Sequence, residues 1–283
     1  MKRKIKVIVD SASDLGKEIY EKYDIDVVPI YVILGDTTYQ DYYEIDTARI
    51  YAFTEETGIY PKTSAASPIK FYNSFKKYYD GGYDILYVGL SSKLSATYSI
   101  ALQAAREVDP KGERIFLVDS GNVSVGIGVL VLKALKFIEA GKSVQEVQEL
   151  IQEMAYKTNT LFVIDTLEYL QKGGRCSALV RYAAATLRLK PIIKMIDGLL
   201  EVIKKPIGYK RGLKAMLADV ENDFEKIDQE LVYVAYSVPN HYVDYTVKKV
   251  KNMGFKKVLT ANTGATISTH CGPGTIGIVY IYK

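Results

Sequence analysis

The chain has 283 residues, of which 48% are hydrophobic and 25% charged, and its formal net charge is +4. These values are typical of a soluble globular protein long enough for two domains. The basic residues are scattered, so there is no basic stripe for nucleic acid. Two cysteines make no disulfide framework, and no apolar run reaches the ~18 residues of a membrane span. We therefore expect a cytoplasmic protein.

The first half of the chain alternates between strand-like and helical segments. Strand-like runs cover Lys4–Val9, Ile25–Leu34 with a return arm at Thr37–Ile45, Asp84–Leu90 and Arg114–Val118; helices are expected over Asp46–Gly58, Ile69–Tyr79, Ser95–Val108, Ser124–Glu139 and Ser143–Tyr156. Strands joined by helices of this length pair in parallel through right-handed crossovers. The pattern predicts an α/β fold in which residues 1–157 form an N-terminal three-layer α/β/α domain with a mainly parallel sheet.

From about Asn159 the pattern changes. A hairpin around Asp197-Gly198 is the clearest new signal, because this dipeptide favours a tight turn between two apolar arms. The other expected elements are strands at Leu161–Ile164, Leu231–Tyr236, Lys256–Thr260 and Thr275–Tyr282, and helices at Ser177–Leu187, Tyr209–Phe224 and Tyr242–Met253. Residues 158–283 are therefore expected to form a smaller C-terminal α+β domain.

Hydroxyl-rich turns follow several of the predicted strands. They cover Asp10–Asp14, Thr63–Ser67, Ser91–Thr97 and Asp119–Ser124. Loops after parallel strands meet at the carboxyl edge of the sheet, where ligands bind. Hydroxyls beside helix N-termini suit an anion, so a small anionic head group is the first candidate ligand.

Helix capping is the simpler explanation for some of these hydroxyls. Ser67, Ser124 and Ser143 stand where helix N-caps are expected, and Ser11 with Asp14 has the spacing of a capping box. The turns at Thr63-Ser64 and Ser91–Thr97 hold more hydroxyls than a cap uses, which favours ligand binding there.

Two histidines are present, and they receive different interpretations. His270 lies among hydroxyls and before a glycine turn, which favours a functional role over a simple hydrogen-bonded loop histidine. His241 follows Pro239-Asn240 at a helix start and is interpreted as a surface residue. Gly272–Gly277 has the spacing of a dinucleotide fingerprint, but it precedes a strand instead of opening a helix, so nucleotide binding is not expected.

Other site chemistries were compared with anion binding. A serine hydrolase would use serine, histidine and aspartate, yet the G-x-S-x-G nucleophile elbow is absent, and Lys93 beside Ser92 gives only a faint serine–lysine pairing. The cysteines and histidines lack metal-ligand spacing, so no metal or other cofactor is expected. Lys172 and Arg175 flank a glycine pair, either as solvated charges or as partners of an anion.

The motifs together resemble the DegV family, which includes the fatty-acid-binding subunits of bacterial fatty acid kinase. The matching stretches run in family order over nearly the whole chain. They are Asp10–Leu15, Thr63-Ser64 with Ser67-Pro68, Ser91–Tyr98, Asp119-Ser120, Leu167–Arg175, Lys190–Ile193 and Thr269–Gly274.

The resemblance implies a two-domain protein that holds one long-chain fatty acid in an apolar tunnel between the domains. By this resemblance Thr63, Ser95 and His270 bind the carboxylate, and the neighbours of the head group are Ser64, Ser92, Thr97, Thr269, Lys172 and Arg175. It leaves open which of the last two basic residues reaches the head group.

The resemblance also implies a carrier that does no chemistry itself and presents the carboxylate to an ATP-dependent kinase subunit, which makes acyl phosphate for phospholipid synthesis. No nucleic acid and no membrane insertion are expected. A serine hydrolase acting on a lipid or ester, and a binder of small anionic metabolites, remain the alternatives.

Overall fold

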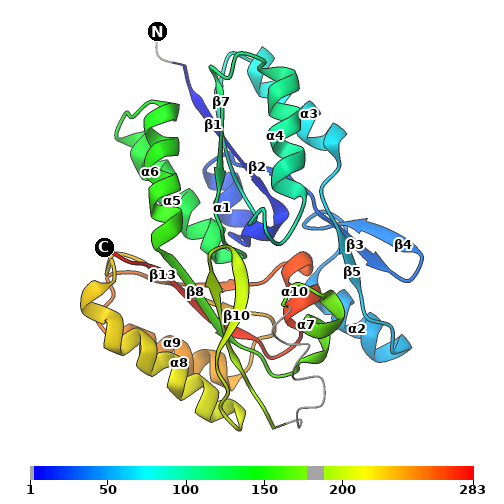
Figure 1. The fold of residues 1–283 in the computed structure, drawn as a ribbon, viewed down its shortest axis with the longest axis vertical. Coiled ribbons are helices and arrows are strands. Elements are labelled where there is room, and N and C mark those ends of the chain that lie inside the picture. The colour runs from blue at the N-terminus through cyan, green and yellow to red at the C-terminus, as the bar shows by residue number, and fades with distance from the viewer. Residues whose placement is uncertain (1–2, 177–187) are drawn as a thin grey trace.

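The computed structural model describes residues 3–176 and 188–283. Its first sheet has four parallel strands in the order β2-β1-β6-β7 (Figure 1). The strands are β1 (Ile5–Asp10), β2 (Asp26–Val28), β6 (Asp84–Gly89) and β7 (Ile115–Asp119). Their apolar side chains are almost all buried, as expected for a parallel sheet covered on both faces.

Helices cover both faces of this sheet. In Figure 1, α3 (Pro68–Asp80) and α4 (Thr97–Val108) lie to one side of it, while α5 (Val125–Glu139) and α6 (Val144–Lys157) lie to the other. The short helix α1 (Lys17–Lys22) follows a 3₁₀ turn at Ser11–Ser13. The predicted three-layer α/β/α arrangement with a parallel sheet is confirmed.

The predicted strand at Ile25–Leu34 is two strands. Pro29 has no N–H to donate to a sheet and separates β2 from β3 (Tyr31–Leu34). The second strand leaves the parallel sheet and pairs in antiparallel fashion with β4 (Thr37–Gln40) and β5 (Lys62–Ser64). The predicted return arm is thus confirmed, whereas β5, with three mainly polar residues, was not predicted.

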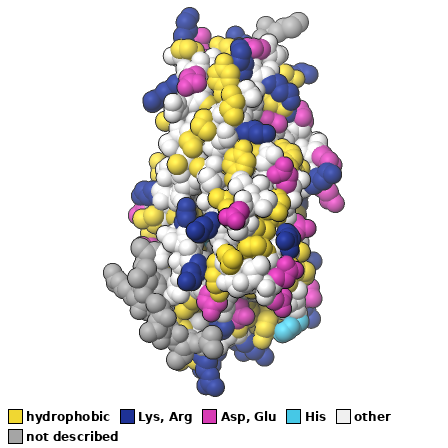
Figure 2. All heavy atoms as spheres, turned by 90° about the vertical axis from the view of Figure 1, so that its right-hand side faces the viewer, with side chains coloured by type: hydrophobic (Ala, Val, Ile, Leu, Met, Phe, Trp, Pro, Cys, Tyr) yellow, Lys and Arg dark blue, Asp and Glu magenta, His cyan; other side chains and the backbone are white. Residues whose placement is uncertain are grey.

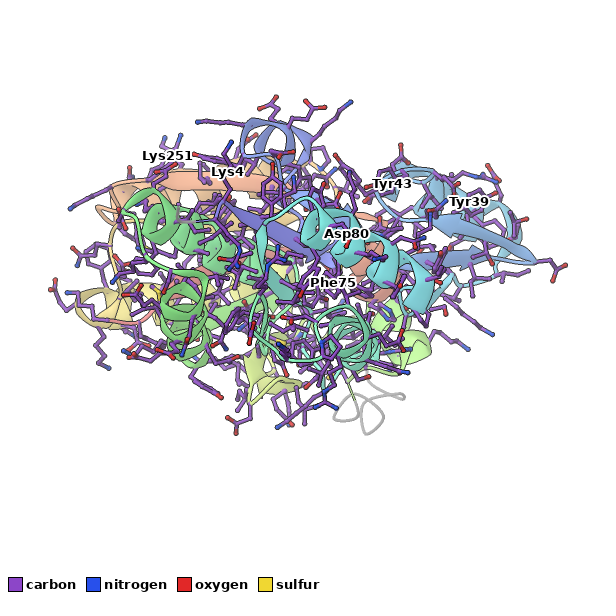
Figure 3. All side chains as sticks on the ribbon, turned by 90° about the horizontal axis from the view of Figure 1, so that it is seen from above. Lys4, Tyr39, Tyr43, Phe75, Asp80 and Lys251 are labelled. Carbon is purple, nitrogen blue, oxygen red and sulfur yellow. The ribbon has the colours of Figure 1, made fainter. Side chains whose placement is uncertain are left out.

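The three-stranded sheet β4-β3-β5 and α2 (Thr47–Thr57) form an arm at one side of the molecule (Figure 1). Seen from above in Figure 3, Tyr39 lies out on this arm, while Phe75 on α3 lies near the middle of the molecule. On the face carrying the arm, hydrophobic side chains form a broken band among charged ones (Figure 2).

The second sheet has six strands in the order β10-β9-β8-β13-β11-β12, and only β11 and β12 are parallel neighbours. The strands are β8 (Thr158–Val163), β9 (Ile192–Ile196), β10 (Leu199–Lys204), β11 (Val232–Tyr236), β12 (Val258–Asn262) and β13 (Ile276–Ile281). The predicted hairpin β9–β10 is confirmed, since Asp197 and Gly198 both have positive φ, at 49° and 78°, as its tight turn requires.

The remaining helices lie on or beside the second sheet. They are α7 (Glu168–Gly173), α8 (Tyr209–Asp223), α9 (His241–Asn252) and α10 (Ala265–Cys271), with a 3₁₀ turn at Phe224–Lys226. Helices α8 and α9 lie side by side (Figure 1). The helix expected at Ser177–Leu187 falls outside the described residues. None of the helices in the described part of the chain is long and apolar enough to cross a membrane.

Helix α5 connects the two large sheets. Its residues from Val125 to Val131 are all buried, and the helix contacts β6 of the parallel sheet as well as β8, β11 and β13. One hydrophobic cluster therefore continues from the parallel sheet through α5 to one face of the six-stranded sheet. A helix packed on both sides needs apolar residues all round, which explains the nearly unbroken run Val123–Leu132.

Capping explains fewer serines than the sequence predicts. Ser143 and Glu146 form a complete capping box, as predicted. Ser67 and Ser124 precede helices without making a side-chain cap bond, and the Ser124 hydroxyl instead donates to Asp14 at 2.5 Å. The predicted capping box of Ser11 with Asp14 is wrong: Ser11–Ser13 form a 3₁₀ turn, Asp14 follows it, and the side chains of Ser11 and Asp14 bond to distant segments.

Candidate functional site

A cavity lies where the parallel sheet, the arm and the six-stranded sheet meet. About 940 Å³ of space lies within its walls, including the part that opens to solvent. Its lining residues are Ile30, Thr63, Ser64, Ala65, Leu90, Leu94, Ser95, Val123, Ser124, Val125, Thr160, Phe162, Leu170, Arg175, Leu200, Ala235, Tyr236, Thr263, Thr266, Ile267, His270, Cys271, Thr275, Gly277 and Val279. Both halves of the chain contribute to this lining.

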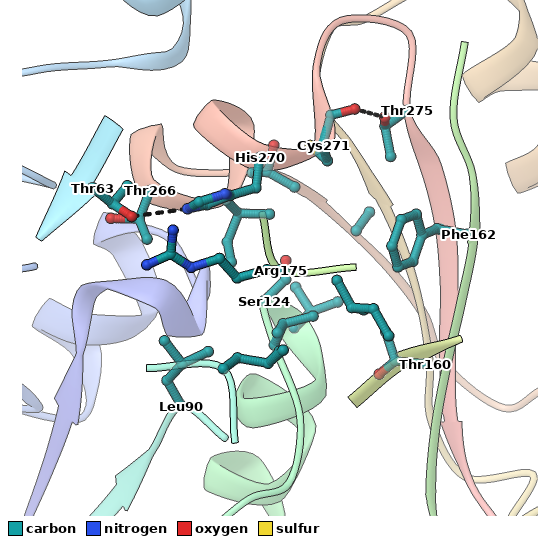
Figure 4. Close-up of a pocket in the computed structure, with 18 of the residues that line it drawn as sticks. Thr63, Leu90, Ser124, Thr160, Phe162, Arg175, Thr266, His270, Cys271 and Thr275 are labelled. Carbon is teal, nitrogen blue, oxygen red and sulfur yellow. Dashed lines mark hydrogen bonds between the residues drawn. The ribbon is translucent and has the colours of Figure 1, made fainter. Parts of the chain in front are cut away.

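Polar groups with ligand-binding capacity gather at one side of the cavity. Thr63 on β5 and His270 near the end of α10 are joined by a hydrogen bond of 2.8 Å between Oγ1 and Nε2. Arg175, just after α7, extends its guanidinium toward the same pair (Figure 4). Figure 4 shows Phe162 and Thr160 at the opposite side. The cavity thus has a polar end and an apolar end.

Ser95 brings a second hydroxyl system to the cavity. It lies in the loop between β6 and α4, and its Oγ is 2.9 Å from Oγ1 of Thr97. Thr97 is fully buried, and its Oγ1 also accepts the N–H of Ala66 at 3.4 Å. Thr97 therefore holds Ser95 from behind and does not face the cavity itself.

Of the other predicted neighbours of the head group, some line the cavity and others do not. Ser64 and Arg175 line the cavity. Ser92 and Lys172 are exposed and do not line it, so of the two basic residues Arg175 is the one at the cavity. Thr269 is buried behind the lining.

His270 is held in its neutral form. Burial, and to a smaller extent the positive charge of Arg175, lowers the pKa of His270 to about 4. Among the described residues no carboxylate pairs with Arg175, whose guanidinium donates only to the carbonyl oxygen of Gly173, at 2.7 Å. The polar end therefore offers hydroxyls, a neutral imidazole and one cation, a set that suits a single negative charge.

Two buried carboxylates fix the helix that carries His270. Asp14 accepts the backbone N–H of Gly264 at 2.9 Å, and Asp41 accepts those of Ala265 and Thr266 at 3.1 and 3.2 Å. These N–H groups open α10 and have no partner within the helix. Burial raises the pKa of both carboxyls, against the lowering effect of their hydrogen bonds. Asp14, predicted as part of an anion-binding turn, instead accepts hydrogen bonds from Ser124 and Gly264 within the protein.

The apolar end is built on one face of the six-stranded sheet. Strand register places Phe162, Gly277 and Ala235 in one row across β8, β13 and β11. The next row holds Thr160, Val279 and Tyr233. Side chains of one face alternate along each strand, so these rows face α5 while the residues between them face away. Gly277 has no side chain and Ala235 only a methyl group, so the first row projects little from the sheet and leaves space above it.

The hydroxyls deeper in the cavity are engaged within the protein. Thr160 donates to Oδ1 of Asn122 at 2.8 Å, and Thr275 donates to the carbonyl oxygen of Cys271 at 2.8 Å. The hydroxyl of Thr263 is 2.8 Å from that of Ser268. Burial raises the pKa of Cys271 to about 12, so this cavity residue is a neutral thiol. A ligand in this part of the cavity therefore meets a largely apolar surface.

Sequence reasoning missed most of the apolar lining. The residue types at Ala235, Gly277 and Val279 are also common in protein cores. Only the strand register shows that these three residues face a cavity. A small residue inside the apolar strand Ile276-Gly277-Ile278 was the one available signal. His270, expected in a loop or at a glycine turn, lies in helix α10, and the glycine turn follows it.

Comparison with known proteins agrees with this geometry. A family model described as "Uncharacterised protein, DegV family" matches residues 4–283. The DegV domain-containing protein CPE1310 of Clostridium perfringens is 30% identical over 278 residues, which are 98% of each chain. A fatty-acid-binding DegV family protein from Thermus thermophilus is 29% identical, with a TM-score of 0.92 over 99% of this chain and 100% of that one. A stearic acid-binding protein from Eubacterium ventriosum is 25% identical, with a TM-score of 0.89 over 99% of this chain and 98% of that one. The chain described here therefore belongs to the DegV family.

Proposed function

We propose that the protein binds one long-chain fatty acid, with the acyl chain in the cavity and the carboxylate at Thr63, Ser95 and His270. The observation that carries this proposal is the division of one cavity into a polar end and an apolar end. Related proteins described as binding fatty acids share the fold over nearly their whole length, which supports the same ligand class here.

The energetics favour a ligand with a long alkyl chain. Each buried methylene contributes roughly 0.8 kcal/mol, so a chain of about sixteen carbons supplies on the order of 10 kcal/mol before ordering costs. A small anionic metabolite would leave the apolar end unfilled and gain none of this energy. The affinity therefore comes from the chain, and the polar end fixes the orientation.

At the polar end, each group has a separate part in binding the carboxylate. Thr63 and Ser95 supply O–H donors, and Arg175 supplies the charge that neutral His270 lacks. Charge-assisted hydrogen bonds are the stronger kind. Arg175 is also exposed to solvent, which supports a carboxylate position near the surface of the protein.

We further propose that the cavity is an interdomain tunnel between residues 1–157 and 158–283, and that the protein is a cytoplasmic carrier without catalytic activity. A carboxylate held near the surface can be reached by a second protein. This supports, together with the family resemblance, presentation of the carboxylate to a fatty acid kinase subunit.

A hydrolase acting on a lipid or ester is the second candidate, because Thr63 and His270 form a hydroxyl–imidazole pair. A catalytic triad also needs a group on the other imidazole nitrogen to orient the ring. Among the described residues, Nδ1 of His270 has no hydrogen-bond partner. A fluorophosphonate probe that labels Thr63 would favour the hydrolase.

The proposal is tested by native mass spectrometry of the purified protein with lipid extraction. We expect one long-chain fatty acid per chain in the wild type and reduced occupancy in Thr63→Val and Ser95→Ala. Ser92→Ala is the matched control, because Ser92 belongs to the same loop as Ser95 but is exposed and does not line the cavity. Undiminished occupancy in both head-group variants would refute the carboxylate assignment.

A further inference from the structure

Gly173 lies against the imidazole ring of His270. A Cβ atom added to Gly173 would stand 2.2 Å from Nδ1 and 3.1 Å from Cε1 of that ring. The first of these distances is shorter than real Cβ atoms show, so no residue with a side chain fits there while His270 keeps its place. The backbone of Gly173 is not left-handed, and its conformation alone does not require glycine.

Its neighbour Gly174 is a glycine for a different reason. Gly174 has φ of 68° and ends α7, a conformation that favours glycine. A Cβ on Gly174 would meet nothing within 4 Å. The glycine pair thus combines one residue selected by backbone conformation with one selected by contact with His270.

Helix α7 has further aromatic contacts that limit its movement away from the ring. The ring of Tyr169 packs edge-on against Tyr51 and Tyr60, with centroids 5.6 and 5.1 Å apart. Tyr60 also donates a hydrogen bond to Glu168. A side chain at position 173 would therefore displace the imidazole, which is the more movable partner.

The contact also determines where the imidazole carries its hydrogen. The position that a Cβ would take on Gly173 is filled by a C–H group, so Nδ1 faces a C–H group instead of an acceptor. Among the described residues Nδ1 has no conventional partner in either tautomer, but a hydrogen on Nδ1 would point into this C–H group, whereas the lone pair of an unprotonated Nδ1 can lie against it. The neutral ring therefore carries its hydrogen on Nε2 and donates it to Oγ1 of Thr63.

We propose that Gly173 is a positioning residue that holds His270 as the Nε2–H tautomer and thereby turns the Thr63 hydroxyl into a donor toward the cavity. Because Thr63 accepts from His270, its own hydrogen is free for a negatively charged ligand. The part of this inference that concerns the ligand rests on the proposed fatty acid binding. The part that concerns the tautomer does not.

The tautomer is measured by side-chain ¹⁵N NMR, where exposed His241 serves as the internal reference because the chain has only two histidines. In the wild type we expect a protonated Nε2 and an unprotonated Nδ1 on His270. In Gly173→Ala we expect this signature to be lost and His270 to titrate at higher pH. A wild-type His270 with its hydrogen on Nδ1 overturns the proposal.

Ligand affinity gives the second measurement, with palmitate as the probe. We expect Gly173→Ala to weaken binding about ten-fold, the effect of losing one hydrogen bond to a charged group. Removing the ring removes the clash, so Gly173→Ala with His270→Ala should bind no more weakly than His270→Ala alone and should unfold at a higher temperature than Gly173→Ala.

Gly174→Ala is the matched control. It should lower the unfolding temperature without changing the NMR signature of His270. Adding His270→Ala should not restore that temperature. Wild-type palmitate affinity and an unchanged tautomer in Gly173→Ala would contradict the proposal. A lower unfolding temperature in Gly173→Ala that is not restored when His270→Ala is added would also contradict it. If the wild type binds no fatty acid, the proposed function fails, while the NMR signature still decides the tautomer.

Discussion

At the scale of single residues, the site depends on charges that are not at the ligand. Both oxygens of Asp41 are fully used: one accepts from Tyr42 and Ala265, and the other accepts from Ser11 and Thr266. The carboxylate is therefore an acceptor for four donors from three separate segments. An amide cannot replace it without loss, because in either orientation its NH₂ group would face at least one backbone N–H.

We predict that Asp41→Asn destabilises the protein by about 2–3 kcal/mol, although it removes a buried charge. Urea unfolding followed by circular dichroism measures this free energy. Asp36→Asn, at an exposed turn, is the control and should leave the free energy of unfolding nearly unchanged. An Asp41→Asn variant as stable as the wild type would show that the carboxylate is dispensable for fixing α10.

His270 predicts a pH dependence of stability. Its pKa of about 4 in the folded protein lies below the 6.5 of an unperturbed histidine, so between these values the unfolded chain binds more protons. The contribution of His270 is thus complete above pH 6.5 and is lost as the pH falls toward 4. Asp10 acts in the opposite direction, because burial raises its pKa to about 6.

The effect of His270 is isolated by comparing the wild type with His270→Gln. We expect the wild type to lose on the order of 2 kcal/mol relative to the variant between pH 6.5 and 4, since one pKa unit corresponds to about 1.4 kcal/mol and the ring is not completely buried. Denaturant unfolding at several pH values gives the difference. A pH-independent difference would mean that His270 titrates normally in the folded protein.

At the scale of elements, the size of the inward-facing residues on neighbouring strands determines how much space the apolar end of the cavity has. Val279 and Val234 lie on adjacent strands but on opposite faces of the six-stranded sheet: Val279 lines the cavity, and Val234 packs in the separate cluster beneath α8 and α9. Truncating Val279 therefore enlarges the space for the ligand, whereas truncating Val234 leaves a void inside the separate cluster.

We predict that Val279→Ala shifts the bound fatty acids toward longer or bulkier chains and that Ala235→Val shifts them toward shorter ones. Lipid mass spectrometry of the protein after exposure to a mixed fatty acid pool gives the distribution. Val234→Ala should cost stability, about 1–3 kcal/mol for a lost buried side chain, while its lipid profile stays that of the wild type. Identical profiles for all variants would place the acyl chain elsewhere.

At the scale of the whole molecule, the alternation of strands and helices predicted the parallel sheet, and Asp197-Gly198 predicted the hairpin of the second sheet. Local signals of this kind are independent of distant contacts. The split between β2 and β3 was missed because the run Ile25–Leu34 is largely apolar apart from Asp26, with Pro29 as the one break signal. Its two halves join different sheets only through long-range pairing.

The candidate site was predictable only in part. The surplus of hydroxyls at Thr63 and Ser95, and a lone histidine beside a glycine turn, marked the polar end before any coordinates. The links that hold this end together join residues more than 200 positions apart, such as Thr63 with His270 and Asp41 with Ala265. The apolar end uses ordinary core residues, and sequence patterns do not distinguish a residue facing a cavity from one facing a neighbour.

The most direct measurement is a crystal structure with a long-chain fatty acid that carries bromine on its terminal carbon. The anomalous signal of bromine locates the end of the chain without relying on the shape of the density. The proposed orientation predicts a bromine beside Thr160 and Val279, with the carboxylate at Thr63, Ser95 and His270 and close to Arg175. A bromine beside Thr63 and His270, or outside the cavity, would contradict it.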